Sequence, residues 1–291
     1  MKKIIILMPV YNDWESLNKL LFEINQVVQN LSGYNFQCVV INDCSTVERS
    51  KIDKPKNLVS LRIVNMKKNQ GHARCNATGL RYINSNTKYD YVIVMDSDGE
   101  DRPIEIKDLV NEISKNPSVS VVAKRVKRSE GFIFQSLYQL HKLITYIFTG
   151  KKINFGNYTC LTKKDVNVLC NSASLWSSFS GTLKKNLPNF SEVDSIRGSR
   201  YFGPSKMSLL NLIIHSFSII SVFKYTVFLR SVFMIIILSF LTSIIGLVAS
   251  IFQVLIVLFS LLIFLVSKRE NEKELIKSNE NILNENDILH Q

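Results

Sequence analysis

The first part of the chain alternates between short apolar runs and longer amphipathic stretches. In residues 13–31, 73–83 and 103–115, apolar side chains recur three or four positions apart, which predicts helices with one buried face. A strand covered on both faces is apolar throughout, because each face meets another layer. The runs therefore predict strands of a mostly parallel α/β sheet with helices on both faces. They cover residues 3–8, 36–41, 59–64, 91–95 and 119–123.

Polar residues follow the first four predicted strands directly. Tyr11 and Asn12 follow the first strand, Asn42 and Asp43 the second, residues 69–72 the third and residues 96–101 the fourth. Parallel strands end at the same edge of a sheet, and open α/β sheets bind ligands beyond that edge. The sequence therefore predicts a cleft at this edge, whose carboxylates suit a metal-bound nucleotide.

Asp96 and Asp98 form the sharpest of these polar clusters. The chain turns at Gly99 and Pro103, and carboxylates two positions apart can share one hard cation with a diphosphate. Taken alone, such a pair is more typical of a solvated acidic turn. Its place beside the other polar clusters favours a metal site, with Glu100 as a further candidate ligand.

An uncharged apolar block occupies residues 231–267, and basic residues flank it on both sides. A single helix of that length would measure about 55 Å, whereas the hydrocarbon core of a bilayer is about 30 Å thick. Two transmembrane helices, near 231–249 and 251–267, fit if a tight turn falls around 250–253. The block therefore predicts a transmembrane hairpin.

The basic flanks of this block predict its orientation. Lys224 and Arg230 precede the block, and Lys268 and Arg269 follow it. By the positive-inside rule both ends of the hairpin lie in the cytosol. We therefore expect an integral protein of the cell membrane, with its α/β domain and both termini cytosolic.

The regions around the block have distinct compositions. Residues 207–230 predict an interfacial amphipathic helix followed by a basic linker. Residues 132–149 predict another helix with an apolar and aromatic face, for which core packing and an in-plane membrane position are both open. Residues 268–291 form a polar cytosolic tail without a motif, for which we expect a solvated helix or disorder.

Charge and cysteine content narrow the function classes. A net charge of +12 suits nucleic acid or an anionic membrane surface, and the basic flanks of the apolar block favour membrane lipid. The chain has no nucleic-acid motif, so we expect no nucleic-acid partner. The cysteines number five, and an odd number argues against a disulfide framework. They also lack metal-ligand spacing, which argues against a zinc site.

Four segments, taken in order, resemble the successive signatures of family-2 inverting glycosyltransferases. The resemblance runs over about the first two hundred residues, and the ordered set is more specific than any one segment. It implies the glycosyltransferase-A fold, in which a Rossmann-like half binds a nucleotide sugar and the Asp-x-Asp motif holds Mg²⁺ or Mn²⁺. The segments are Pro9-Val10-Tyr11-Asn12, Ile41-Asn42-Asp43-Cys44-Ser45-Thr46, Asn69-Gln70-Gly71-His72-Ala73 and Met95-Asp96-Ser97-Asp98.

The resemblance implies a role for individual residues. Asp43 would bind the nucleoside, and Asp96, Asp98 and Glu100 would serve the metal on the diphosphate. Cys44 stands where the family usually has Gly. This difference bears on the geometry of the turn and does not change the role implied for the Asp43 carboxylate. The implied contacts of the UDP- or GDP-linked sugar are Pro9, Tyr11, Asn12, Asp43, Asn69, Gly71 and Asp96.

The segment before the membrane block also resembles a known one. Its Arg-x-x-Gly-x-Ser-Lys core, residues 200–206, is similar to the segment preceding the membrane region of polyprenyl-phosphate glycosyltransferases, including dolichyl-phosphate mannose synthases. Guanidinium, ammonium and hydroxyl groups beside a lipid surface suit a phosphate. A polybasic collar for anionic lipid is the alternative. The implied acceptor-phosphate residues are Arg125, Arg128, Arg200, Ser205 and Lys206, although Arg125 and Arg128 also suit a solvated edge.

Asn157 stands where many relatives carry an Asp near the reaction centre. An amide cannot act as a general base, which a hydroxyl acceptor requires. A phosphate acceptor needs less help, because a phosphomonoester with a second pKa of about 6 is largely dianionic at neutral pH. Asn157 therefore favours a lipid-phosphate acceptor.

These observations predict a membrane-anchored, metal-dependent inverting glycosyltransferase that moves a sugar from a nucleotide sugar to a polyprenyl phosphate. Asp96, Asp98, Arg200 and Lys206 are its predicted catalytic residues. The alternatives are a transferase acting on a glycan or lipid hydroxyl, and a non-catalytic nucleotide-binding membrane subunit. The sequence is compatible with a homo-oligomer and does not predict the oligomeric state. The predicted divisions are 1–206 (glycosyltransferase-A domain), 207–230 (interfacial), 231–267 (transmembrane) and 268–291 (tail).

Overall fold

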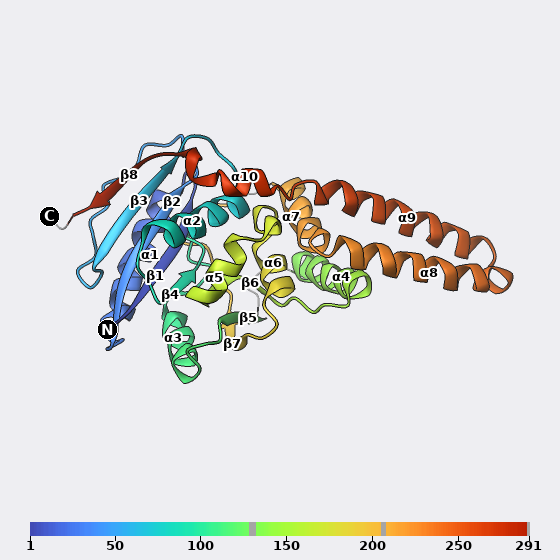
Figure 1. The fold of residues 1–291 in the computed structure, drawn as a ribbon, viewed down its shortest axis with the longest axis horizontal. Coiled ribbons are helices and arrows are strands. Elements are labelled where there is room, and N and C mark those ends of the chain that lie inside the picture. The colour runs from blue at the N-terminus through green and yellow to red at the C-terminus, as the bar shows by residue number, and fades with distance from the viewer. Residues whose placement is uncertain (128–131, 205–207, 290–291) are drawn as a thin grey trace.

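An eight-stranded mixed sheet forms the centre of the α/β domain in the computed structural model, which describes residues 1–127, 132–204 and 208–289. The strand order is β7-β5-β6-β4-β1-β2-β3-β8, and a pair of long helices projects from the domain (Figure 1). The strands are β1 (Lys2–Val10), β2 (Tyr34–Asn42), β3 (Ser60–Met66), β4 (Tyr91–Val94), β5 (Val121–Lys127), β6 (Phe155–Thr162), β7 (Ser191–Ile196) and β8 (Ile282–Ile288).

Both faces of the sheet are covered, which explains the continuous apolar runs. In β1, Ile4, Ile6 and Met8 enter one core, and Ile5 and Leu7 enter the core on the opposite face. The first core includes α1 (Trp14–Val28) and α3 (Ile106–Lys115), which follows the short helix η1 (Pro103–Glu105). The second core includes α2 (His72–Asn86), α5 (Lys163–Cys170), η2 (Ala173–Trp176) and α6 (Phe179–Asn186).

The parallel part of the sheet agrees with the sequence expectation. Strand β1 pairs in parallel with β2 and β4, and β2 pairs in parallel with β3. Three strands were not predicted. Of these, β6 and β8 run antiparallel to their neighbours β4 and β3, and β7 pairs in parallel with β5. Because β6 runs against β4, its first residues lie beside the carboxyl end of β4, where Asp96 follows.

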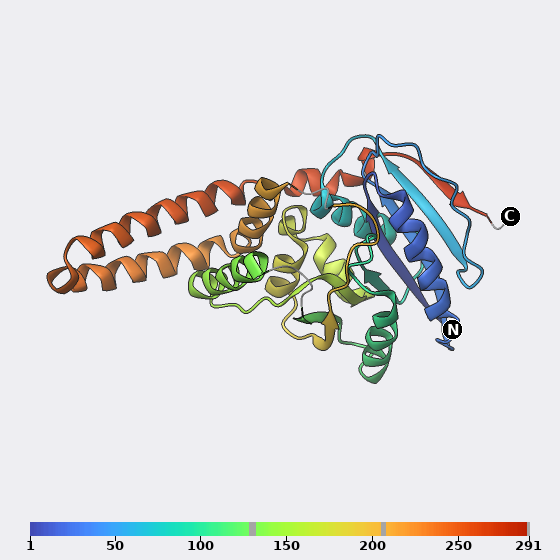
Figure 2. The same cartoon turned by 180° about the vertical axis from the view of Figure 1, so that it is seen from behind.

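The helical hairpin consists of α8 (Lys224–Ile245) and α9 (Leu247–Ser267), and α7 (Leu209–Ser221) precedes it (Figure 2). Both long helices are apolar and long enough to cross a membrane. Their side chains are largely exposed, as at Phe240 with 78% and Leu247 with 76% of the side chain accessible. This pattern fits the predicted membrane hairpin, since water-soluble helices bury such residues.

The turn of the hairpin lies earlier than we expected. Gly246 joins the two helices with φ of 54° and ψ of −128°, a conformation that only glycine adopts readily. The expected turn at 250–253 was wrong, because Gly246 adopts the turn conformation and the uniform composition of the uncharged block does not mark this position. The first long helix also begins inside the stretch 207–230, at Lys224, which removes most of the expected linker.

Helix α4 (Phe132–Thr149) lies where a helix was predicted and packs on the hairpin. The rings of Phe148 and Phe259 are 4.2 Å apart between centroids, and Arg230 donates a hydrogen bond to the carbonyl of Ile147 at 3.1 Å. Other apolar side chains of this helix are exposed, so core packing accounts for only one of its faces. They include Leu137, Leu140, Leu143 and Tyr146.

The C-terminal tail is folded, contrary to the expected solvated helix or disorder. It forms α10 (Glu272–Ile276), the short helix η3 (Ser278–Asn281) and β8, which completes the sheet beside β3. The sequence of β8 lacks an apolar pattern because most of its residues stay exposed at the edge. Its stability comes from pairing with β3, which a local sequence pattern does not reveal.

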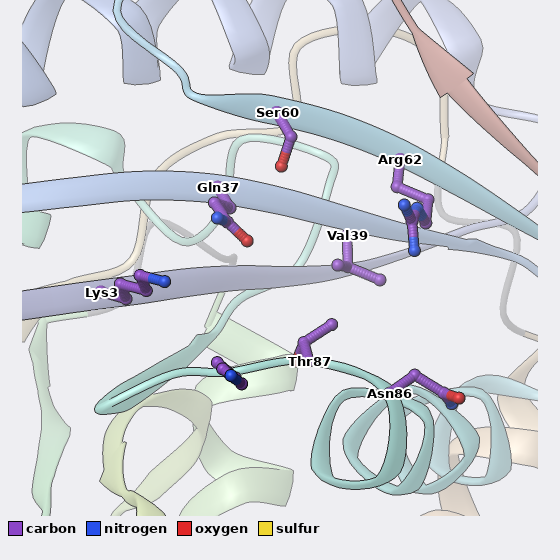
Figure 3. A pocket seen from close by; sticks show the side chains of 8 residues that line it. Lys3, Gln37, Val39, Ser60, Arg62, Asn86 and Thr87 are labelled. Carbon is purple, nitrogen blue, oxygen red and sulfur yellow. The ribbon is translucent and has the colours of Figure 1, made fainter.

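A pocket of about 230 Å³ lies at the amino ends of the parallel strands (Figure 3). It is lined by Lys3, Gln37, Ser60, Arg62 and Thr87 among others. Ligands of such sheets bind at the carboxyl ends, so this pocket lies at the opposite edge from the predicted cleft.

Candidate active site

The loop after β4 carries the carboxylates and folds around them. Asp101 accepts a hydrogen bond from the backbone amide of Asp96 at 2.9 Å, and Asp98 accepts one from Glu100 at 3.0 Å. Gly99 has φ of 92°, and a side chain at this position would meet the ring of Tyr201 at 2.6 Å. The loop conformation therefore requires glycine there, and it sets Asp96 and Asp98 at the mouth of the sheet.

His72 and Asn157 surround Asp96. The Nε2 atom of His72 lies 3.2 Å from Oδ1 of Asp96, and Nδ2 of Asn157 donates to the same oxygen at 3.2 Å. Asn157 also lies 2.6 Å from His72 Nε2. His72 was not among the predicted site residues, although it belongs to the third polar cluster and begins α2 directly after Gly71. Asn157 thus binds the carboxylate and imidazole of the site through its amide.

Burial and nearby charges shift the pKa values of the carboxyl groups of Asp96, Asp98 and Asp101 in different directions. Burial acts to raise the pKa of Asp96, but the charges of His72 and of two nearby arginines outweigh it and lower the pKa well below its usual range. Burial and the Asp96 charge raise the pKa of Asp98. The same two causes raise the pKa of Asp101 to about 7. The carboxylates of the site are therefore buried close together and repel one another. A bound cation would reduce this repulsion.

Two arginines of the segment after β7 form ion pairs with carboxylates of the site. Arg200 pairs with both Asp98 and Asp13, and Arg197 pairs with Glu100. The backbone amides of Gly198 and Tyr201 donate to the carbonyls of Glu100 and Asp98 at 2.8 and 2.9 Å. The predicted Arg200 is thus part of the site. Asp13, Arg197 and the backbone of this segment were missed, because no motif marks them.

The carboxylates fit a hard divalent cation that is shared with a substrate. Asp96 and Asp98 offer oxygen donors whose side chains are 17% and 15% exposed. Magnesium is often held by one or two carboxylates together with substrate phosphates, so two protein ligands suffice. Within the described residues no three His, Cys, Asp or Glu side chains form a ready group for a metal. Glu100, which is paired with Arg197, is therefore not gathered with Asp96 and Asp98 into such a group.

The loops after β1, β2 and β3 meet on the other side of the site. Asp43 accepts hydrogen bonds from the backbone amides of Gln70 and Gly71, both at 2.8 Å, and is 4% exposed. Cys44 has φ of 57°, which explains why glycine is usual at this position. Asp43 therefore fixes the loop that carries Asn69 and Gly71, the latter at a φ of 86°.

The remaining predicted nucleotide contacts surround this junction. Asn12 accepts hydrogen bonds from the amides of Thr46 and Val47 at 2.8 and 3.0 Å, which joins the loops after β1 and β2. Pro9 is buried and its carbonyl accepts a hydrogen bond from the Ser97 hydroxyl at 2.6 Å, whereas Tyr11 is exposed beside it. The structure thus brings the four predicted loops together at one edge.

The predicted acceptor-phosphate residues are only partly described. Arg125 lies against Gly156, where a side chain would collide with its guanidinium, and its charge helps to lower the pKa of Asp96. It is therefore beside the site. Arg128, Ser205 and Lys206 lie outside the described residues.

The profile of glycosyl transferase family 2 matches residues 5–179, which is more than half of the chain and includes all four loops. The chain belongs to glycosyl transferase family 2. This finding confirms the family that the sequence resembles.

Curated family-2 relatives include two undecaprenyl-phosphate 4-deoxy-4-formamido-L-arabinose transferases. The one of Photorhabdus laumondii is 23% identical over 225 residues, which cover 73% of this chain and 65% of the relative. That of Serratia proteamaculans is 24% identical over 224 residues, with the same coverage. The chain thus spans slightly less than two thirds of the length of these relatives.

A solved structure with a similar fold is glucosyl-3-phosphoglycerate synthase of Mycobacterium tuberculosis, in complex with Mn²⁺, UDP and glucosyl-3-phosphoglycerate. Its TM-score is 0.50 at 14% identity, and the alignment covers 77% of this chain and 80% of the synthase. A second complex, with UDP-glucose and phosphoglyceric acid, also has a TM-score of 0.50. The glycosyltransferase-A fold expected from the sequence is confirmed.

Proposed function

We propose that this family-2 chain is a membrane-anchored inverting glycosyltransferase, which transfers a sugar from a nucleotide sugar to a polyprenyl phosphate. One observation supports this most directly: Arg197, Arg200 and Tyr201, which precede the membrane helices, lie on Glu100 and Asp98. The carboxylate site therefore adjoins the part of the chain that meets the membrane.

The donor is a UDP- or GDP-linked sugar bound across the loops that Asp43 and Asn12 hold together. Pro9, Tyr11, Asn69 and Gly71 border the nucleotide. The relatives named as undecaprenyl-phosphate transferases and the UDP complexes of the solved structures support this assignment. Asp43 shapes the site by fixing the amides of the loop after β3.

Asp96 and Asp98 would hold a divalent cation, Mg²⁺ or Mn²⁺, which would supply charge neutralisation for the diphosphate leaving group. The chain's own residues orient the reaction. An acceptor phosphate oxygen forms a bond to the anomeric carbon from one face, and the bond to the diphosphate oxygen breaks on the other. Arg125 and Arg200, with Arg128, Ser205 and Lys206, hold the acceptor phosphate beside this carbon.

Asn157 fits this acceptor. Its amide already binds Asp96 and contacts His72, and it has no basic group with which to remove a hydroxyl proton. A phosphate dianion needs no such base at neutral pH. We therefore favour the phosphate over a glycan or lipid hydroxyl.

The sheet sets the membrane topology of this proposal. Strands β1 to β7 precede the hairpin and β8 follows it, yet all belong to one sheet. This arrangement supports a position of both hairpin ends on the same side of the membrane. Lys224 and Lys268 flank the hairpin, which favours the cytosol as that side by the positive-inside rule. The exposed apolar side chains of α4 rest at the membrane surface beside α8.

We divide the function accordingly. Residues 1–206 form the catalytic domain, residues 207–230 begin at the membrane surface, residues 231–267 lie within the hairpin, and residues 268–291 return to the cytosol. In this division the C-terminal residues are a structural part of the catalytic domain, since β8 pairs with β3.

The test uses membranes that contain the full chain. They are incubated with labelled UDP- and GDP-sugars, Mg²⁺ or Mn²⁺, and undecaprenyl or dolichyl phosphate. We expect a lipid-linked sugar that mild acid releases, because a glycosyl phosphate is labile where an ordinary glycoside survives. An acid-stable product would indicate a hydroxyl acceptor. Nucleotide binding without any product across the common donors would contradict catalysis.

A further inference from the structure

The C-terminal segment 272–288 is built into the α/β domain after it returns from the membrane (Figure 1). Leu275 on α10 is 1% exposed and belongs to the same core as Cys75 and Trp176. Arg81 on α2 donates hydrogen bonds to the carbonyls of Ile276 and Cys170, both at 3.1 Å. These contacts attach the segment to the helix that follows the nucleotide loop.

The same segment holds the entrance of that loop. The backbone amide of Lys67 donates to the carbonyl of Asn281 at 2.8 Å, and Met66 pairs with Ile282 in the sheet. The exit of the loop is held by Asp43 through the amides of Gln70 and Gly71. The loop is therefore fixed at both ends, and the C-terminal segment supplies one of the two attachments.

A row of side-chain amides continues from the segment to the next loop. Asn284 on β8 accepts a hydrogen bond from Asn65 at 2.6 Å, and Asn65 accepts one from Asn42 at 2.8 Å. The carbonyl oxygen of the Asn42 side chain accepts from the amide of Ser45 at 3.0 Å. The row thus connects the ends of β8, β3 and β2, and it finishes in the loop that contains Asp43.

We propose that segment 272–288 positions the nucleotide side of the active site, with Asn284 as a positioning residue for a nucleoside diphosphate. The proposal rests on the proposed function, because it assigns the nucleotide to the loops after β2 and β3. A loop that is already fixed loses less conformational freedom on binding, which increases its affinity for the ligand. The affinity for the nucleotide donor therefore depends on residues that follow the membrane hairpin in the sequence.

The experiment uses the full chain in lipid nanodiscs. Asn284→Ala removes the acceptor for Asn65, Asn284→Asp keeps an acceptor oxygen, and Asn286→Ala is the control on the same strand. The Asn286 side chain has no hydrogen-bond partner within the described residues. The measurements are the Kd for UDP and GDP by calorimetry, the KM for polyprenyl phosphate, and deuterium uptake at the backbone amides of residues 67–71.

We expect Asn284→Ala to raise the nucleotide Kd by about threefold to tenfold, which is the effect of one lost hydrogen bond. Deuterium uptake at residues 67–71 should rise with it, while the acceptor KM stays within twofold. Asn284→Asp should restore both values, and Asn286→Ala should change neither. Asn284 is exposed, so the variant should keep the melting temperature of the parent.

Two results would overturn the proposal. One is an unchanged nucleotide Kd with unchanged exchange at residues 67–71 in Asn284→Ala. The other is an equal loss of donor and acceptor binding with faster exchange across the whole sheet. If the parent protein binds neither UDP nor GDP, the proposed function fails instead. The exchange measurement at residues 67–71 still decides whether the C-terminal segment positions the loop.

Discussion

The two sides of the active site are held by different kinds of interaction. On the nucleotide side, Asp43 and Asn12 accept hydrogen bonds from backbone amides of neighbouring loops. On the membrane side, Arg197 and Arg200 form ion pairs with Glu100 and Asp98. The first set joins a side chain to the backbone, and the second joins two side chains of opposite charge.

This difference indicates how the two sides serve a transfer reaction. Hydrogen bonds to backbone amides fix a loop in one geometry, so the nucleotide side is preformed. A guanidinium on a partly buried carboxylate is strongly held, yet it can exchange that carboxylate for a phosphate because both match its planar fork. In the proposed reaction, the arginines of the membrane side can therefore exchange a carboxylate for the acceptor phosphate.

The largest effect is expected from Asp98→Asn, which removes a charge shared by Arg200 and the proposed cation. The kcat should fall by about 100- to 1,000-fold, because stabilisation of the leaving diphosphate is lost. Radiolabelled transfer to lipid measures it. Asp53→Asn, an exposed carboxylate change, is the control and should be neutral. A loss below threefold at position 98 would remove Asp98 from the catalytic residues.

Next in size is Arg200→Ala, which tests the membrane side alone. We expect the KM for polyprenyl phosphate to rise by about 10- to 100-fold, as for a lost charged hydrogen bond, while the nucleotide Kd changes little. Arg200→Lys should not restore it, since one ammonium cannot span Asp98 and Asp13. Steady-state kinetics with each substrate varied provide the measurement, and Arg49→Ala serves as the exposed control. Equal effects on both substrates would contradict the division into two sides.

The opposite pattern is expected from Asp43→Asn. An amide NH₂ replaces one oxygen and cannot accept from the backbone amide of Gln70 or Gly71, so the loop is released at one end. The nucleotide Kd should rise by about tenfold, with the acceptor KM unchanged. Calorimetry with UDP and GDP measures the first value. A raised acceptor KM with normal nucleotide binding would reverse our assignment of the two sides.

The smallest effect concerns the edge strand β8, at the end of the sheet opposite the nucleotide loops. The hydrogen bond from Arg62 lowers the pKa of Asp287 on β8. Because the folded pKa lies below the unfolded value of about 3.9, this pair stabilises the fold above that pH and loses its contribution as the pH falls through the folded pKa.

Asp287→Asn should therefore flatten the acid dependence of the melting temperature by only about 1–2 °C, since the pair is exposed. Melting curves between pH 5 and pH 3 measure this change. A larger acid dependence in the variant than in the parent would show that Asp287 does not contribute in this way.

The fold was predictable where the signal is local. Continuous apolar runs such as Ile4 to Met8 identify strands buried on both faces, and the uncharged block identifies the membrane hairpin. Strand β8 was not predictable, because its exposed side chains show no apolar pattern. Its stability comes from pairing with β3, which lies far away in the sequence: the paired residues Arg62 and Asp287 are 225 positions apart. Gly246 was likewise not distinguished as the turn by composition alone.

The sequence by itself determined the chemistry of the site. The types and order of Asp43, Asp96 and Asp98 at strand ends follow from local patterns, because a strand and the turn after it are encoded together. The tertiary structure decided the partners of these groups. Asn157 reaches the carboxylates from the antiparallel β6, Arg200 from the segment after β7, and His72 from the start of α2. Such contacts depend on how distant parts of the chain pack together, which no local pattern encodes.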